Sequence, residues 1–189
     1  MRNGFSLIEM VFVIVILGVL AGVAVPRFAA TRMDKKVATL RSDTASTLKV
    51  IVAKVFADNL DTTAELAPEP NDRLKRPALA WNQWMIEVGG LSRHKWLPSK
   101  NDAKNRGISP AYKVGIENIP CGEEPYISIT ENGNLYFNPS ALAKEKTYSG
   151  IGAGLKEYLI CQKLRDSYKS SIGAGNKVIP LTSTQTISF

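Results

Sequence analysis

The hydrophobic pattern separates one long apolar segment from a mixed remainder. No side chain is charged or polar from Met10 to Val25, and the apolar stretch begins at Phe5, with Glu9 as its single acid. The 21 residues from Phe5 to Val25 match the ~20 residues that a helix needs to cross ~30 Å of hydrocarbon. The pattern therefore predicts a helix that spans a membrane if it is retained.

After Pro26 the pattern becomes amphipathic. Apolar residues recur mostly at steps of three and four, with basic residues on or near the other face. We predict one helix from about Phe5 to Asn59, broken lightly at Pro26 and roughly 80 Å long. Its second half is expected to form the spine of a soluble head, and strict heptads are not sustained, which disfavours a coiled coil. The apolar positions of this half are Met33, Val37, Leu40, Leu48, Ile51, Val52, Val55, Phe56 and Leu60.

The chain beyond the spine alternates between turns and short regular elements. Prolines and polar residues from Asp61 to Pro77 predict a loop. A short helix is predicted over Leu79–Val88. Its aromatic side chains, Trp81 and Trp84 with Met85, are expected to pack in the core rather than to bind a partner.

Strand signals follow. The runs Tyr112–Ile119 and Tyr126–Thr130 are rich in β-formers, and Asn132-Gly133 predicts a hairpin. Ala153–Ser170 reads as another helix, and short edge strands are expected afterwards. These elements predict an α+β fold with a long N-terminal helix packed against a small antiparallel sheet. The expected edge strands are Val178–Leu181 and Thr186–Phe189.

Charge and cysteine content limit the partners and the kinds of site that the sequence predicts. The net charge of +7 suits acidic partners and solubility alike, because the basic residues are spread out. The two cysteines, Cys121 and Cys161, have no CxxC spacing, and one histidine accompanies them. We predict a disulfide formed in an oxidising compartment, with two buried unpaired thiols as the alternative.

No catalytic constellation emerges. His94 stands alone in a basic loop and is expected to be solvated. The run Gly150–Gly154 lacks the residues of a phosphate-binding loop and is expected to be a flexible turn. The acids Glu123, Glu124 and Glu131 lack the spacing of a calcium loop. We therefore predict a non-enzymatic protein without a metal or other cofactor.

The order of features at the N-terminus differs from that of a secretory signal. The leader MRNG carries Arg2 and ends in Gly4, and the apolar run follows that glycine instead of preceding a cleavage site. A carboxylate in such a segment costs a few kcal/mol in hydrocarbon. Hydropathy leaves two interpretations open for Glu9: a functional contact with a partner, or a position in the headgroup region.

The string G-F-S-L-I-E-M-V-F-V-I-V-I-L-G-V-L-A-G-V-A-V-P, from Gly4 to Pro26, resembles the N-terminus of the type IV prepilin family, which includes pilins and the pseudopilins of type II secretion. The resemblance covers about 23 of the 189 residues. It implies a pilin-like fold, cleavage by prepilin peptidase after Gly4 and N-methylation of Phe5.

The resemblance also implies roles within the helix. Glu9 would pair with the N-terminal amine of a neighbouring subunit, which gives a reason for an otherwise costly charge. Glycine and proline weaken helices, and family filaments have a loosened region that the match places between Gly18 and Pro26, with Gly22 between them. The alternative interpretation is that these small residues allow close helix packing or a mild kink, and the two interpretations are compatible.

The predicted organisation is a leader (1–4), a transmembrane and filament-core helix (5–26), an amphipathic spine (27–60) and an α+β head (61–189). The expected partners are other pilin or pseudopilin subunits, prepilin peptidase, an inner-membrane assembly platform and membrane lipid. The expected location is the bacterial inner membrane with the head in the periplasm, and then a filament in the periplasm or at the cell surface. Basic residues after Pro26 outnumber Arg2, which by the positive-inside rule predicts the opposite orientation.

Parts of the sequence are compatible with two other functions. The segment would be an ordinary signal peptide if it were cut near Ala24, which would make the chain an exported domain with Val25 at its N-terminus. DNA binding by the basic head, with Trp96 or tyrosines stacking on bases, is disfavoured because no basic stripe is evident.

Overall fold

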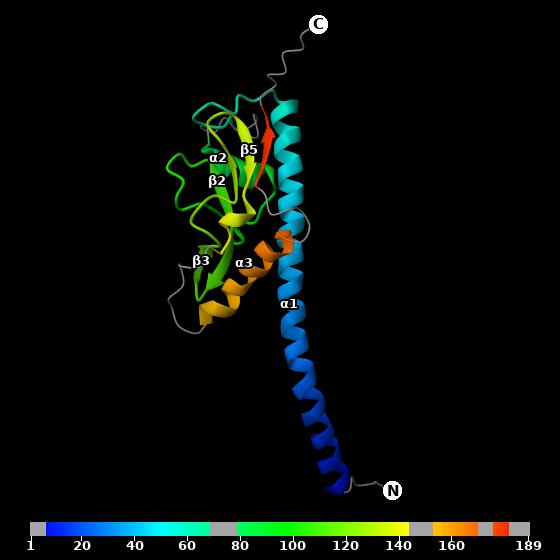
Figure 1. Ribbon diagram of the computed structural model, residues 1–189. Helices are drawn as coiled ribbons and strands as arrows, with labels where there is room; N and C mark the ends of the chain where they lie inside the picture. Colours follow the sequence, from blue (N-terminus) through cyan, green and yellow to red (C-terminus); the bar gives the residue numbers. More distant parts are fainter. Residues whose placement is uncertain (1–6, 69–78, 144–152, 170–175, 182–189) are drawn as a thin grey trace. The chain divides into compact units, whose positions relative to one another are not determined.

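A computed structural model describes residues 7–68, 79–143, 153–169 and 176–181, with the side chains of 21–30 and 153–157 left out. The chain forms two compact units, Met1–Ala38 and Thr39–Phe189. Helix α1, Leu7–Ala57, runs through the division (Figure 1).

The predicted helix Phe5–Asn59 is confirmed over the described residues as α1. The light break predicted at Pro26 is wrong, because α1 is one uninterrupted helix through this position. A proline removes one backbone hydrogen-bond donor from a helix. In a helix of this length, the hydrogen-bonded turns on both sides of the proline remain helical.

In the second unit, α1 buries a face that mixes aliphatic and hydroxyl side chains. Leu40, Ile51 and Val55 are buried as their spacing predicted, and Thr44 and Thr47 are buried with them. The Thr44 hydroxyl donates to the Leu40 carbonyl at 2.7 Å, so this polar group remains satisfied away from water.

Phe56, one of the apolar positions of the spine, is not part of the core. Its side chain is 53% exposed. It lies one residue beyond Val55, and consecutive residues on a helix point about 100° apart, so both cannot face the core.

The sheet is antiparallel throughout, with the order β1-β2-β4-β5-β6 and with β3 paired to β2. The central strand β2 pairs with β4 through Gly107 and Ile108 and with β3 from Ala111 onwards. Pro110 lies where β2 changes partner, a place where its missing N–H costs little. The strands are β1 Trp96–Pro98, β2 Gly107–Val114, β3 Glu117–Pro120, β4 Ile127–Ile129, β5 Asn134–Phe137 and β6 Lys177–Pro180.

The single strand predicted over Tyr112–Ile119 is in fact a hairpin. Val114 pairs with Glu117, which leaves Gly115 and Ile116 as a two-residue turn. Gly115 has a φ of +60°, and turns with positive φ at the first central position favour glycine. A glycine inside a β-rich run was the sequence signal for this turn.

The hairpin predicted at Asn132-Gly133 is confirmed between β4 and β5, where Ile129 pairs with Leu135. Gly133 has a φ of +75° and its N–H donates to the Thr130 carbonyl. The predicted strand at Val178–Leu181 is confirmed as β6, and Thr186–Phe189 lies outside the described residues.

Aromatic side chains form much of the core. Helix α2, Trp81–Val88, confirms the predicted short helix, and Trp81, Trp84 and Met85 are buried. The rings of Trp81 and Trp84 meet edge to face with centroids 5.3 Å apart, a geometry that adds to the gain from burying their surface.

Helix α3, Ala153–Lys169, confirms the predicted late helix. It contacts β2 and the short 3-10 helix η2, Pro139–Ala141, and Figure 1 shows it beside the β2–β3 hairpin. Cys161 on α3 forms a disulfide with Cys121, which directly follows β3. The predicted disulfide is therefore present.

Candidate functional site

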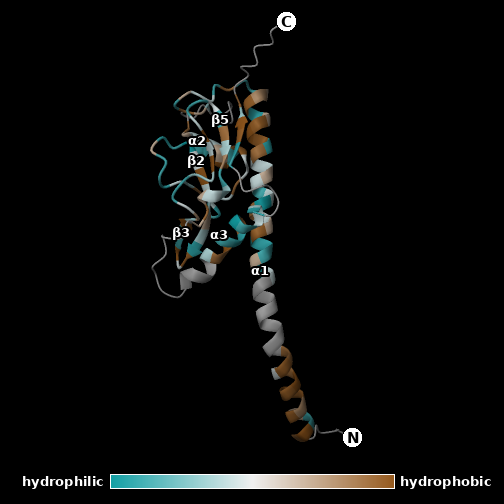
Figure 2. Cartoon of the chain, viewed as in Figure 1, coloured by the Kyte–Doolittle hydropathy of each residue, from teal (hydrophilic) through white to brown (hydrophobic). Residues whose placement is uncertain are grey.

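The start of α1 is apolar and exposed. Each large apolar side chain from Leu7 to Leu20 has at least 41% of its surface exposed, the value of Ile16, and Leu7 reaches 82%. Figure 2 shows these hydrophobic residues gathered at this end of the helix. A helix that is apolar all round requires an apolar environment, such as lipid or other helices.

Glu9 lies in the first turn of α1 and is exposed. A carboxylate in the first turn interacts favourably with the helix dipole, typically by 0.3–1 kcal/mol. Glu9 therefore stabilises the helix start, in addition to the pairing role that the resemblance implies.

The structure describes only some of the other predicted site residues near the N-terminus. Gly4 and Phe5 lie outside the described residues, and Gly22 and Pro26 lie where side chains are not described. Around Gly18 an added Cβ would meet no atom within 4 Å, so no contact within the chain itself requires a glycine there.

Over the described part of the chain, no helix is both long and apolar enough to cross a membrane. The predicted segment, Phe5–Pro26, includes residues outside that part.

Comparison with known proteins identifies the N-terminal segment. Residues 1–25 match the model of the prokaryotic N-terminal methylation motif, so the chain carries a type IV prepilin-like signal. The motif indicates a pilin-like, processed protein and points to a structural class rather than to an enzyme. Whole-chain comparisons with curated proteins and with solved structures gave no match.

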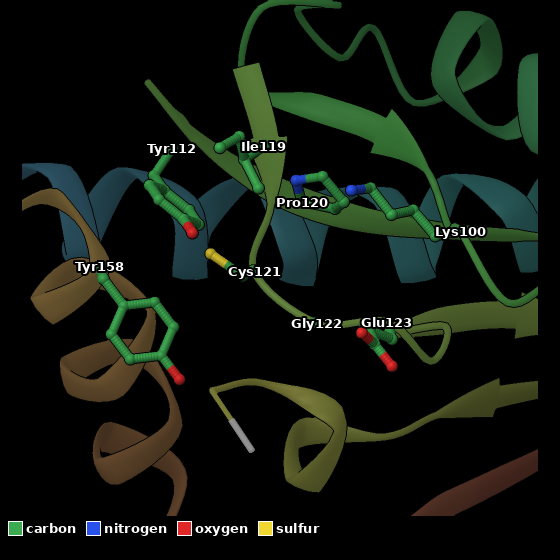
Figure 3. A pocket seen from close by; sticks show the side chains of 8 residues that line it. All are labelled: Lys100, Tyr112, Ile119, Pro120, Cys121, Gly122, Glu123 and Tyr158. Carbon is green, nitrogen blue, oxygen red and sulfur yellow. The ribbon is translucent and has the colours of Figure 1, made fainter. Parts of the chain in front are cut away.

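A cavity of about 160 Å³ lies beside the disulfide in the head (Figure 3). Tyr112 of β2 and Tyr158 of α3 form one side, with ring centroids 5.9 Å apart and nearly perpendicular planes. Ile119 and Pro120 of β3 add apolar surface. The cavity thus lies where the β2–β3 hairpin meets α3.

The opposite side of the cavity is polar and open to solvent. Lys100 and Glu123 line it, and both are exposed. Glu123 is held by Asn101, whose side-chain amide donates to its carboxylate at 3.4 Å and whose N–H donates to its carbonyl. Lys100 takes part in none of the ion pairs found among the described residues.

A second polar feature of the head is the buried guanidinium of Arg106. It donates to the carbonyls of Ile129 and Ala64, each at 2.8 Å, and also to those of Thr62 and Thr130. Burial lowers the pKa of Arg106 from its ordinary value, and nearby carboxylates oppose this effect. Because its partners are backbone carbonyls, the arrangement is structural: it ties the chain leaving α1 to the β4–β5 turn.

The remaining predicted head residues are separate from the cavity. His94 is exposed, as expected, and Glu131 pairs with Lys104 at 2.7 Å, which lowers the Glu131 pKa. Trp96 has no exposed surface, so it cannot stack on a nucleic-acid base. Over the described residues, no group of three or more metal-ligating side chains comes together.

The sequence did not indicate the cavity beside the disulfide. Its lining residues come from 100, from 112 to 123 and from 158, and no motif links such distant positions. The cysteine pair was the only signal that these segments meet.

Proposed function

We propose that the chain is a structural subunit, a pilin or pseudopilin, of a type IV pilus or a type II secretion pseudopilus. The observation that carries this proposal is the methylation motif at residues 1–25, followed by an apolar helix exposed on all sides. Lipid before assembly, and the helices of neighbouring subunits afterwards, would both cover such a helix.

In this proposal, the chain is first held in the bacterial inner membrane by α1, with the head in the periplasm. Prepilin peptidase cuts between Gly4 and Phe5, and Phe5 is N-methylated. An assembly platform then moves the subunit from the membrane into a filament. The Cys121–Cys161 disulfide supports a periplasmic head, since such bonds form in oxidising compartments.

Glu9 has a specific part in this process. Its carboxylate pairs with the new amine of a neighbouring subunit, which offsets the cost of an acid in an apolar filament core and selects the register of assembly. The acid belongs to the first turn of α1, next to the segment where the new amine is generated.

The mature N-terminus tests the proposal directly. The full chain should be expressed with and without prepilin peptidase, and the first residue should be read by mass spectrometry. We expect methylated Phe5 only with the peptidase, and Gly4→Val should remain uncut. A mature chain starting at Val25 would instead establish an ordinary signal peptide.

Glu9→Leu tests assembly separately from processing. We expect cleavage and an intact head, but loss of most filaments in preparations sheared from cells. Glu65→Gln, which removes an exposed head carboxylate, is the control and should assemble normally. Normal filaments from Glu9→Leu would refute the pairing role.

A further inference from the structure

The tip of the β2–β3 hairpin presents an apolar side chain to solvent. Ile116 is 99% exposed, far more than any other large hydrophobic residue described in the head. It occupies the second position of the two-residue turn closed by the Val114–Glu117 pair. The glycine supplies the positive φ that such a turn requires. The β-branched side chain beside it is exposed, so it contributes no burial energy to the fold of its own head.

The cavity beside the disulfide is suited to a side chain of this kind. It holds about 160 Å³ between Tyr112, Tyr158 and Ile119, and a cavity of roughly 150 Å³ with apolar walls accommodates a benzene-sized molecule. An isoleucine side chain therefore fits.

The tip cannot enter the cavity of its own head. Strand residues advance ~3.3 Å each, which places Ile116 roughly 10 Å beyond Tyr112, and the paired strands between them hold the tip away. The Ile116 side chain that enters this cavity is therefore that of another copy.

Charge complements shape at this contact. Glu117 follows Ile116 and is exposed. Lys100 lies at the solvent side of the cavity together with Glu123, whose carboxylate already accepts a hydrogen bond from Asn101. Within the described ion pairs, neither Glu117 nor Lys100 has a partner of opposite charge. An isoleucine seated in the cavity would bring the following carboxylate toward the lysine.

We propose that Ile116 and Glu117 of one copy dock on the cavity and Lys100 of a neighbouring copy. The two surfaces differ, so the contact is head to tail and repeats from subunit to subunit. The inference rests on the proposed function, because it is a contact between heads along a filament.

Carbodiimide coupling tests this contact on filaments of the full chain. The reagent joins amines to carboxylates that touch, so we expect a ladder of covalent multimers and a 100–117 cross-linked peptide. Glu117→Gln should abolish that peptide, whereas Glu87→Gln, at a carboxylate paired within its own head, should leave it unchanged.

Substitutions test the energetics. Ile116→Asp should reduce filament yield about tenfold or more, and Ile116→Val should keep most of it. Glu117→Lys and Lys100→Glu should each reduce yield, and together they should restore it. Thermal unfolding should stay at the wild-type temperature for all of these exposed positions.

The outcomes separate the two proposals. Processed filaments that give no 100–117 peptide, or that assemble normally with Ile116→Asp, would overturn the contact alone. A wild-type chain that is neither cut at Gly4 nor assembled would overturn the filament function and the contact with it.

Discussion

The hydroxyl oxygens of Thr44 and Tyr126 lie 3.2 Å apart in the interior of the head, and this hydrogen bond joins α1 directly to the residue preceding β4. Tyr126 has no exposed surface and packs against Phe137 with ring centroids 5.1 Å apart. Burial raises the pKa of Tyr126 well above its ordinary value of 10.0. The second half of α1 is thus fixed to the sheet by a polar contact inside an aromatic core.

Tyr126 predicts how stability depends on alkaline pH. The unfolded chain releases this proton near pH 10, whereas the folded chain keeps it, so stability is fully present below that pH and is lost as pH rises above it. Tyr126→Phe should lower the free energy of unfolding by about 1 kcal/mol at neutral pH. As the pH rises, the stability of this variant should decrease less than that of the wild type. Urea unfolding of the isolated full chain at several pH values measures this. Thr44→Val keeps the tyrosine, so its stability should still decrease at alkaline pH as in the wild type. If the stability of Thr44→Val does not decrease there, the hydrogen bond and not the buried tyrosine causes the pH dependence.

Arg106 should be essential for the stability of the head. Arg106→Met removes the donor to the buried carbonyls of Ile129 and Thr62, and each carbonyl left without a donor costs about 1–3 kcal/mol. The Ala64 carbonyl still accepts from the Trp81 indole N–H. We expect urea unfolding to show a loss of about 3 kcal/mol or more. Lys104→Met breaks only an exposed pair with Glu131 and should change stability by less than about 1 kcal/mol. Equal effects of the two substitutions would contradict this role.

The disulfide should contribute much of the stability of the head. The two cysteines are 40 residues apart, and closing such a loop stabilises by about 4 kcal/mol in the chain-entropy model. Cys121→Ser and Cys161→Ser, alone or together, should therefore lower the unfolding free energy by a similar amount. Reduction of the wild-type chain should match these variants in chemical denaturation, and an unchanged midpoint after reduction would argue against the estimate.

Gly18→Ala tests whether α1 must loosen during assembly. The space around Gly18 admits a methyl group, and alanine favours a helix by up to about 1 kcal/mol over glycine. We expect unchanged thermal unfolding of the head and fewer filaments, with a larger loss when Gly22→Ala is added. Wild-type filament yield from the double variant would show that both glycines serve only close packing.

The elements that sequence analysis located best are those with long periodic patterns. The spine helix and α3 agree with their predictions within about two residues at the ends that can be compared. A three-residue strand such as β1 gives no usable period, so the strand that contains the fully buried Trp96 was not predicted. Thr44 was missed as a core residue because a hydroxyl signals exposure until its hydrogen-bond partner, here the Leu40 carbonyl, is known. Thr47 was missed for the same polarity, and its buried hydroxyl makes no hydrogen bond.

The candidate functional sites were also predicted only in part. The N-terminal motif is contiguous, so its residues were identified from the sequence, and residues 1–25 match the methylation motif. The cavity and the exposed tip at Ile116 depend on strand pairing and on the disulfide. Such sites become visible only when distant segments are placed together.

The Arg106 hydrogen bonds have a mechanical consequence. The chain leaves α1 through Thr62 and Ala64, and the guanidinium joins both of their carbonyls to those of Ile129 and Thr130. A pull on the segment that leaves the helix is therefore shared by several hydrogen bonds to the sheet. These bonds would have to break together and not one after another. The segment that follows the helix is therefore held to the sheet at several points at once.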